Sequence, residues 1–434
     1  MKRFGLTVSV LLCTVTLFPI GLGHAQQALT PKEDLGRLLY FDEALSEPAG
    51  QSCASCHHPA IGFDDPDDGL PVSEGVIAGR FGGRNSPISA YAMYAPALHY
   101  DMEEGLWIGG QFWDGRATGS VLGDPLADQA LGPFLNPVEM HNSTKAQVIS
   151  DITASPYAGL FRSVWGSGIL DPGNEAMAYD AVALSIAAFE RTQLFGQFSS
   201  KYDAYLRACV GMGGEMDACA QGTGQIARKA GMGVFTKQEW EGLKLFMGEN
   251  NNDGVMQAGE GAMCAACHIA QWTQGTDYAL PVQVPAWAPA GMVPPVFSDF
   301  TYDNLGVPVN TEYPMDPNPP VDLGLGPIVG DPDENGKFKV MTLRNIGLSA
   351  PYAHNGLFDT LKAIVHFYNT RDVLGALPGG ADWPVAEYPA TVNHDELGNL
   401  GLSDAQEDAL VEFMKTLGDG WRGDRRRNID PVLE

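Results

Sequence analysis

Two copies of one cysteine motif constrain the fold of this 434-residue chain more than any other feature. The first copy consists of Cys53, Cys56 and His57, and the second consists of Cys264, Cys267 and His268. Each has the C-x-x-C-H spacing of covalent haem attachment, in which two thiols bond the vinyl groups of one porphyrin and the histidine ligates iron. A zinc site, a redox-active dithiol pair and plain disulfides are the alternatives. Because the whole motif occurs twice, we expect two covalent c-type haems.

Residues 1–25 have the pattern of a secretory signal peptide. Lys2 and Arg3 precede an apolar run over 4–22, and small residues lead to a cleavage site after Ala25. The run is also long enough for a short membrane anchor, but its basic start and small-residue end favour removal. No later segment has comparable apolarity. We therefore expect a periplasmic mature chain without membrane insertion.

The cysteines outside the haem motifs indicate the same compartment. Cleavage of the signal peptide removes Cys13 and leaves Cys209 and Cys219, which bracket a short glycine-rich stretch. An oxidising periplasm allows a disulfide between them to persist. Two unpaired thiols are the alternative.

The charge of the chain limits its partners. The sequence has 26 Lys and Arg against 53 Asp and Glu, a formal net charge of −27. Nucleic acid and anionic membrane surfaces are therefore excluded as expected partners. A basic redox protein would be attracted to such a surface, although an acidic surface without a particular partner is equally consistent.

Apolar periodicity predicts a mainly α-helical protein with few short strands and long irregular loops. Helices are expected over 176–195 and after capping boxes that begin at Thr236 and Ser403, the last one stopping at Gly418. One motif in each half predicts two cytochrome c-like haem domains, at 26–210 and 225–420, with the boundary within 210–233 and a tail at 421–434. The proline-rich segment 271–336 is expected to wrap the surface near the second haem.

The sequence after the first motif has no evident second ligand for iron. His58 is too close to His57 to reach the opposite face of the haem, the next histidine is His99, and the stretch from 63 to 85 contains neither His nor Met. An electron carrier needs both irons fully ligated, whereas a peroxidase leaves one position open. The sequence therefore favours an open first haem and an enzyme over a di-haem electron carrier.

Several stretches together resemble the bacterial di-haem cytochrome c peroxidase and MauG superfamily. They extend over nearly the whole mature chain and comprise the residues at 83–87, 112–116, 129–140, 338–345 and 349–356, together with both haem motifs and the terminal helix.

The resemblance implies that the first haem is the peroxidatic one and that Gln129, Pro133 and Glu139 line its open side. Glu139 would move a proton from the near oxygen of hydrogen peroxide to the far one, and Gln129 would orient the peroxide by hydrogen bonding. Without the resemblance, residues 136–139 also read as a helix start that places Glu139 near the positive end of the helix dipole.

The same resemblance places Trp113 between the two haems and assigns a calcium ion to Asn85, Ser349 and Pro351, the latter two through backbone carbonyls. Ser349 stands where the family usually has Thr. From the sequence alone, Trp113 is read as a core aromatic residue. A second calcium ion is suggested by the EF-hand-like loop 249–260, for which a plain polar turn is the alternative.

The helix expected over 359–368 carries the most diagnostic residue. Leu361, Ile364, Val365 and Tyr368 share one face, whereas His366 is turned away and is the weaker ligand candidate. In ordinary members of the family a Met at this place ligates the second iron, and in MauG-like members it is Tyr, as here. A phenolate stabilises oxidised iron, so that peroxide would react without prior reduction. A core Tyr is the structural alternative.

This position divides the expected functions. A MauG-like enzyme would use hydrogen peroxide and both haems to oxidise a protein partner or electron donor. A conventional peroxidase would reduce peroxide with electrons from a small cytochrome or copper protein. MauG itself has a surface tryptophan two residues before its second motif, where this chain has Ala262. Trp272 and Trp240 are candidates for another route, with a structural role as the alternative for either.

Overall fold

The structure is a computed structural model in which residues 28–66, 69–248, 261–314, 316 and 319–423 are described. The predicted signal peptide, the loop 249–260 and most of the tail 421–434 lie outside the described residues. The helices are α1 Pro31–Tyr40, α2 Cys53–Cys56, α3 Pro125–Ala130, α4 Lys145–Ala154, α5 Ala158–Trp165, α6 Glu175–Glu190, α7 Lys201–Gly211, α8 Met216–Gln221, α9 Gly224–Val234, α10 Lys237–Met247, α11 Gly326–Val329, α12 Leu361–Thr370 and α13 Asp404–Lys415.

The strands are very short and form three antiparallel pairs. They are β1 His99–Asp101 with β2 Leu106–Ile108, β3 Thr273–Gln274 with β4 Met292–Val293, and β5 Tyr302–Asp303 with β6 Phe338–Lys339. The prediction of a mainly α-helical fold with few short strands is confirmed. None of the helices among the described residues is both long and apolar enough to span a bilayer.

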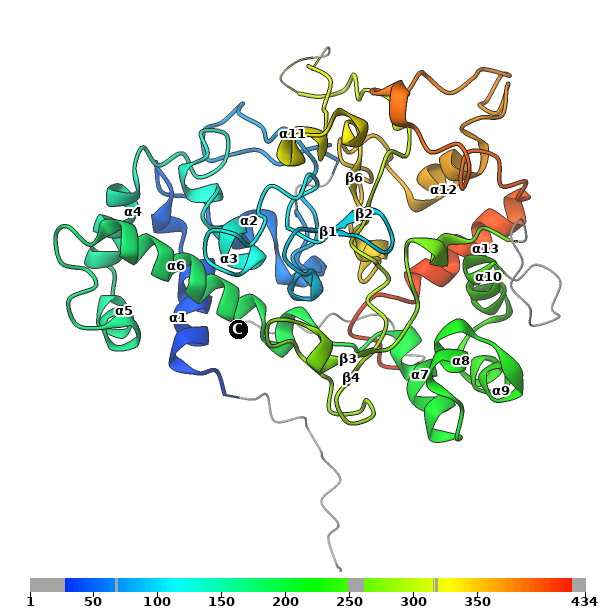
Figure 1. The fold of residues 1–434 in the computed structure, drawn as a ribbon, viewed down its shortest axis with the longest axis horizontal. Helices are drawn as coiled ribbons and strands as arrows, with labels where there is room; N and C mark the ends of the chain where they lie inside the picture. Colours follow the sequence, from blue (N-terminus) through cyan, green and yellow to red (C-terminus); the bar gives the residue numbers. More distant parts are fainter. Residues whose placement is uncertain (1–27, 67–68, 249–260, 315, 317–318, 424–434) are drawn as a thin grey trace, which may run out of the picture.

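Two separate hydrophobic cores organise these elements, and Figure 1 shows the helices around them as two groups. Helices α1 and α3–α6 surround the first core, and α7–α10, α12 and α13 surround the second. The change from one core to the other falls between Phe198 and Tyr202. Helix α7 therefore packs with the second half, although the sequence places the boundary further along, within 210–233.

A glycine in each core allows two helices to cross closely. Gly36 of α1 lies against the Ser185 carbonyl of α6, and Gly242 of α10 lies against the Ala409 carbonyl of α13. A β-carbon at either glycine would overlap the facing backbone and force the helices apart. The two halves therefore share one packing arrangement, a pair of crossed helices beside a haem motif.

The helix signals in the sequence hold with small corrections. Capping boxes at Thr236 and Ser403 begin α10 and α13. Helix α13 ends at Lys415, two residues earlier than Leu417. Helix α6 ends at Glu190 rather than 195, because residues 193–195 form a separate 3₁₀ turn.

The segment 271–336 is largely irregular, but it is not only a surface loop. Residues 292–298 are buried without a break. Val293 and Val296 pack in the first core, whereas Met292 and Phe297 pack in the second. The segment therefore passes between the halves and contributes to both cores, because its apolar side chains point in both directions.

Arg344 lies fully buried at the junction of the cores. Its guanidinium donates hydrogen bonds to Asp203 at 2.8 Å and to the Pro295 carbonyl at 2.6 Å. The same group lies over the rings of Phe198, at 4.8 Å, and Phe297, at 5.5 Å, which belong to opposite cores. One paired cation thus fixes the contact between the halves.

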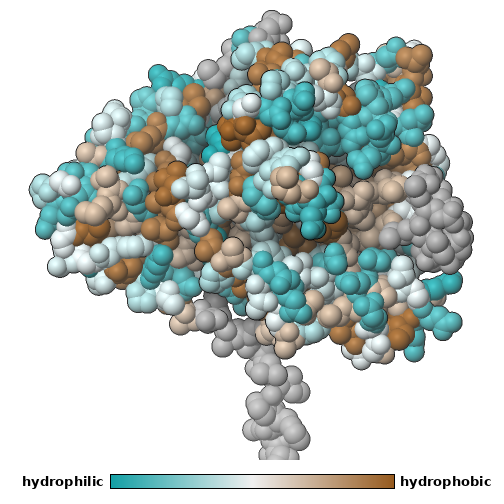
Figure 2. Space-filling view, viewed as in Figure 1, coloured by the Kyte–Doolittle hydropathy of each residue, from teal (hydrophilic) through white to brown (hydrophobic). Residues whose placement is uncertain are grey.

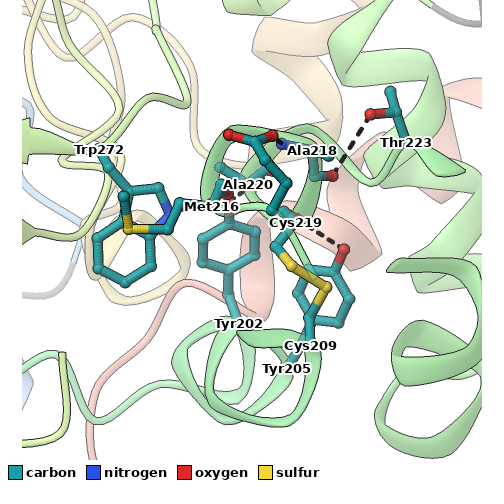
Figure 3. The surroundings of a disulfide bond; sticks show 10 residues. Tyr202, Tyr205, Cys209, Met216, Ala218, Cys219, Ala220, Thr223 and Trp272 are labelled. Atoms are coloured by element: carbon teal, nitrogen blue, oxygen red, sulfur yellow. Dashed lines mark hydrogen bonds between the residues drawn. A yellow bond between two sulfur atoms is a disulfide. The ribbon is translucent and has the colours of Figure 1, made fainter. Parts of the chain in front are cut away.

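The disulfide between Cys209 and Cys219 is present, with a Cα to Cα distance of 5.8 Å, and joins α7 to α8 (Figure 3). Tyr202 and Tyr205 donate hydrogen bonds to the backbone carbonyls of Ala220 and Cys219, both at 2.7 Å. On the face drawn in Figure 2, hydrophilic and hydrophobic residues are interspersed over the surface.

Candidate active site

The first haem motif lies in the wall of a cavity of about 440 Å³. The short helix α2 carries both cysteines, and His57 follows at its C-terminal end. Burial lowers the pKa of His57 to about 4, so that its imidazole is neutral at neutral pH, the form that ligates iron. The structure forms no disulfide between the four motif cysteines.

The predicted distal residues line the same cavity as the first motif. Gln129, Pro133 and Glu139 all contribute to its wall. Gln129 lies near the end of α3, and Pro133 opens a 3₁₀ turn. The structure thus brings together residues that are about 80 positions apart in the sequence.

Glu139 lies in a tight turn, so the alternative of a helix start at 136–139 is wrong. Asn136 donates its side-chain amide to Glu139, and the Val76 backbone donates to the Glu139 carbonyl at 3.0 Å. Gly75 makes this approach possible, because a β-carbon there would overlap the Val138 carbonyl. Burial raises the pKa of Glu139, while Arg116 and the Asn136 hydrogen bond oppose that rise.

Arg116 is a member of the first site that the sequence prediction omitted, although it lies in one of the stretches that carry the resemblance. It lines the first cavity, its guanidinium lies 3.6 Å from the centre of the Phe112 ring, and it pairs with Asp114 at 3.1 Å. The site therefore holds a cation as well as an acid.

The second motif lines a separate cavity of about 230 Å³. His268 is buried, which lowers its pKa to about 4, and its Nδ1 lies 3.0 Å from the Phe297 carbonyl. A hydrogen bond at Nδ1 fixes the ring and leaves Nε2 for a metal. The buried segment 292–298 therefore helps to hold the second motif histidine in place.

Helix α12 presents the predicted face to the second cavity. Leu361, Ile364, Val365 and Tyr368 all line it. His366 is absent from the lining and pairs with Glu407 at 2.9 Å, in agreement with its orientation away from the stripe. Burial and the nearby motif cysteines raise the pKa of Tyr368, so a phenolate there requires a cation beside it.

Other side chains that can ligate iron also line the second cavity. Met263, Met341 and Met414 are all in its wall, and sequence reasoning identified none of them as a ligand. His354 lines it too, but its ring stacks on Phe338 at 3.7 Å and its Nε2 lies 3.2 Å from Glu387. These contacts hold His354 in place as part of the wall.

Trp113 lines both cavities, which a residue confined to one core would not do. Its indole Nε1 donates to the Asn85 carbonyl at 2.9 Å, and its own carbonyl accepts from the Lys339 backbone at 2.8 Å. The indole therefore has a fixed place between the two sites. The surroundings of Trp272 and Trp240 differ: Trp272 is 5% exposed and Trp240 packs against Gly231.

The three residues assigned to calcium lie together in the wall of the second cavity. Asn85, Ser349 and Pro351 all line it, and Asp64, which the sequence prediction omitted, hydrogen-bonds Ser349. Among the described residues no group of three or more His, Cys, Asp and Glu side chains is arranged to hold a metal ion. An ion bound here would therefore depend on amide and backbone oxygens, which calcium accepts.

The two cavities fit covalent haem. Each combines paired thiols at attachment spacing with a neutral histidine, and apolar side chains contribute to the remaining wall of both cavities. Together with the helical fold, these sites define a di-haem c-type protein.

The chain belongs to the di-haem cytochrome c peroxidase and MauG family, and it is accordingly a di-haem peroxidase. The family model for di-haem cytochrome c peroxidase matches residues 30–209. The methylamine utilization protein MauG of Paracoccus denitrificans is 35% identical over 95% of this chain and 94% of its own. Cytochrome c551 peroxidase of Pseudomonas aeruginosa is 27% identical over 77% and 70%.

Solved structures agree with this assignment. The crystal structure of the di-haem peroxidase BthA from Burkholderia thailandensis is similar with a TM-score of 0.68 and 28% identity, covering 91% of this chain and 87% of that one. A MauG-like protein associated with microbial copper homeostasis is similar with a TM-score of 0.57 and 25% identity, covering 91% of both chains.

Proposed function

We propose that this protein is a periplasmic, MauG-like peroxidase that accepts hydrogen peroxide at the first haem and uses both haems to oxidise a protein partner or electron donor. The observation that carries the proposal is the arrangement of three residues: Glu139 in the first cavity, Tyr368 in the second, and Trp113 in the wall of both. Bound haem iron supplies the redox chemistry, namely cleavage of the O–O bond and storage of two oxidising equivalents.

The residues of the first cavity provide the proton chemistry. An ionised Glu139 takes the proton from the near oxygen of peroxide and returns it to the far oxygen, so that water leaves. Gln129 orients the peroxide by hydrogen bonding, and Pro133 keeps this side of the cavity free of a competing ligand. Arg116 favours the ionised form of Glu139 that the first proton transfer needs.

The second cavity decides between direct use of peroxide and a cycle that first needs an electron. Tyr368 as the ligand of the second iron favours the oxidised state and the MauG-like reaction. Met341 and Met414 in the same wall favour the conventional peroxidase as the second candidate, because a thioether ligand raises the reduction potential.

Low-temperature EPR of the fully oxidised, haem-loaded protein tests both points. We expect one high-spin and one low-spin ferric signal, both lost after one equivalent of hydrogen peroxide without reductant. Tyr368→Phe should change the low-spin signal, whereas Met341→Leu, the matched control in the same cavity, should leave it intact. A reversed pattern, or signals that resist peroxide, would favour the conventional cycle.

Calcium at Asn85, Ser349 and Pro351 is part of the proposal, because calcium accepts amide and carbonyl oxygens and these residues share one cavity wall. Atomic emission should find one ion per chain, reduced in Asn85→Ala. A second ion bound by the loop 249–260 would disappear in Asp253→Ala, and an unchanged count would eliminate that loop as a site.

Export and partner choice complete the proposal. Mass spectrometry of the mature protein should give an N-terminus at Gln26. The net charge of −27 favours a basic partner, so that association should weaken as salt increases. A partner reaction that is insensitive to ionic strength would contradict electrostatic attraction.

A further inference from the structure

Glu190 is a buried acid in the wall of the first cavity with no role in the proton chemistry described above. It is the last residue of α6, is 6% exposed, and lines the cavity together with Ile186 one turn earlier. Its Oε2 is buried and has no hydrogen-bond partner among the described residues. An unpartnered buried carboxyl oxygen is costly, which indicates that the group is kept for its chemistry rather than for packing.

The groups around Glu190 provide no cation dedicated to it. Arg191 is adjacent, but its guanidinium pairs with Asp124 at 2.6 Å. Asp124 itself faces Glu190, and Tyr40 from α1 and the Cys53 thiol from α2 are the other titratable groups nearby. The C-terminal end of α6 adds a partial negative charge.

These surroundings favour the protonated carboxyl. Burial, followed by the negative charge of Asp124, raises the pKa of Glu190 to about 8, and Arg191 only partly offsets that rise. Burial also raises the pKa of Glu139 in the same cavity, but there Arg116 and the Asn136 hydrogen bond oppose the rise. Glu190 has no such hydrogen bond at its Oε2.

We propose that Glu190 is a proton-binding site coupled to the first haem, which takes up a proton when that haem gains an electron and releases it when the electron is removed. The inference rests on the proposed position of the first haem in this cavity. The electron comes from an external reductant and the proton from solvent, so that one added negative charge is matched by one added positive charge. Coulomb interaction between the buried carboxyl and the haem provides the coupling.

Asp303, Asp322, Glu387 and Glu396 line the second cavity, but among the described residues none of these four acids has a buried side-chain oxygen without a hydrogen-bond partner. The cavity's buried titratable side chain of opposite sign is Lys339, which is 4% exposed and donates to the Gly110 carbonyl at 2.7 Å. The proposal therefore predicts proton coupling through Glu190 for the first haem only.

Spectroelectrochemical titration of the haem-loaded full chain between about pH 6 and 9 tests this. The potential of the first haem should fall as the pH rises, approaching at most about 59 mV for each tenfold change in proton concentration. Glu190→Gln, which keeps the shape of the side chain, should remove most of this slope and leave the second haem unchanged. Glu175→Gln, at the start of the same helix and outside the lining of the first cavity, is the matched control and should keep the slope.

A slope that persists in Glu190→Gln would overturn the proposal. Infrared difference spectra recorded on reduction give a second readout, because uptake of a proton by Glu190 adds a carboxylic-acid band that the glutamine variant lacks. Neither measurement uses peroxide turnover, so a failure of the proposed peroxidase function, seen as a fully low-spin EPR spectrum, is distinguishable from a failure of the proton coupling.

Discussion

The two haem cavities share an attachment motif and a crossed helix pair, but their walls differ. The first wall contains Glu139, Glu190 and Arg116, groups that hold or stabilise protons. The second wall contains Tyr368 and three methionines among mostly apolar side chains. The scaffold thus fixes where each haem is attached, while the residues opposite the motif decide whether a cavity handles protons or holds a ligand.

The two motif histidines show the same difference. His268 is held by the Phe297 carbonyl at 3.0 Å, whereas His57 Nδ1 has no hydrogen bond of ordinary geometry among the described residues and has the Phe63 carbonyl as a neighbouring acceptor. A firm hydrogen bond at Nδ1 increases the donor strength of the ligating nitrogen. The ring of the second motif histidine is therefore held more firmly than the ring of the first.

Replacing Glu139, the acid of the first cavity, should have the largest effect on the difference between the two cavities. Glu139→Gln leaves no base to take the proton from peroxide, and we expect the reaction with peroxide to slow by about 10²- to 10⁴-fold in stopped-flow experiments. The spectrum of the second haem should not change. Glu104→Gln, in the exposed turn between β1 and β2, should react at the normal rate, and an unimpaired Glu139→Gln would remove Glu139 from the mechanism.

The junction between the halves is expected to have the next largest effect. Arg344→Met leaves Asp203 buried without its cation, and we expect a loss of about 3–5 kcal/mol in the free energy of unfolding. The matched control Arg37→Met breaks only a half-exposed pair with Asp34 and should cost at most about 1 kcal/mol. If chemical denaturation gave equal losses for the two variants, the buried pair at the junction would contribute no more to stability than a surface pair.

The disulfide should stabilise the second half and not the first, because both of its cysteines lie in the second core. Replacing Cys209 and Cys219 together by Ser should lower the free energy of unfolding of that half by about 2–4 kcal/mol. Calorimetry should show the transition of the first half unchanged. A loss shared by both halves would mean that they unfold as one unit.

The smallest expected effect concerns pH. The ionised form of Glu139 accepts the proton, and its pKa is raised above 4.5 by burial, so the peroxide reaction should increase with pH through that raised value. Arg116 lowers the pKa, so Arg116→Met should move the rise to higher pH without changing the plateau at alkaline pH. A profile that stays in place would show that Arg116 does not act on Glu139.

Local patterns in the sequence predicted much of this molecule. Three kinds of feature follow from residues that lie close together in the sequence. They are the capping boxes at Thr236 and Ser403, the disulfide between Cys209 and Cys219, and the apolar stripe that ends at Tyr368. Each depends on short-range geometry, which sequence spacing records directly. The resemblance to a known family added Glu139, which lies far along the chain from its motif.

The residues that sequence reasoning missed depend on long-range packing. Glu190 reads as the polar end of an alanine-rich helix, and only the packed structure shows that it lies beside Cys53. The buried run 292–298 reads as a proline-rich loop, because its apolar side chains face two different cores and have no single period. Met341 is a ligand candidate because it lies in the wall of the second cavity, which no local pattern in the sequence indicates.

Trp113 belongs to the walls of both cavities, and this has a consequence for how the protein can evolve. A substitution at this position alters the surroundings of two haems at once, so that a gain for one site is immediately tested against the other. Glu190 and Met341 each border only one cavity and are free of that constraint. New reactivity should therefore arise first at the outer walls, while the shared wall changes last.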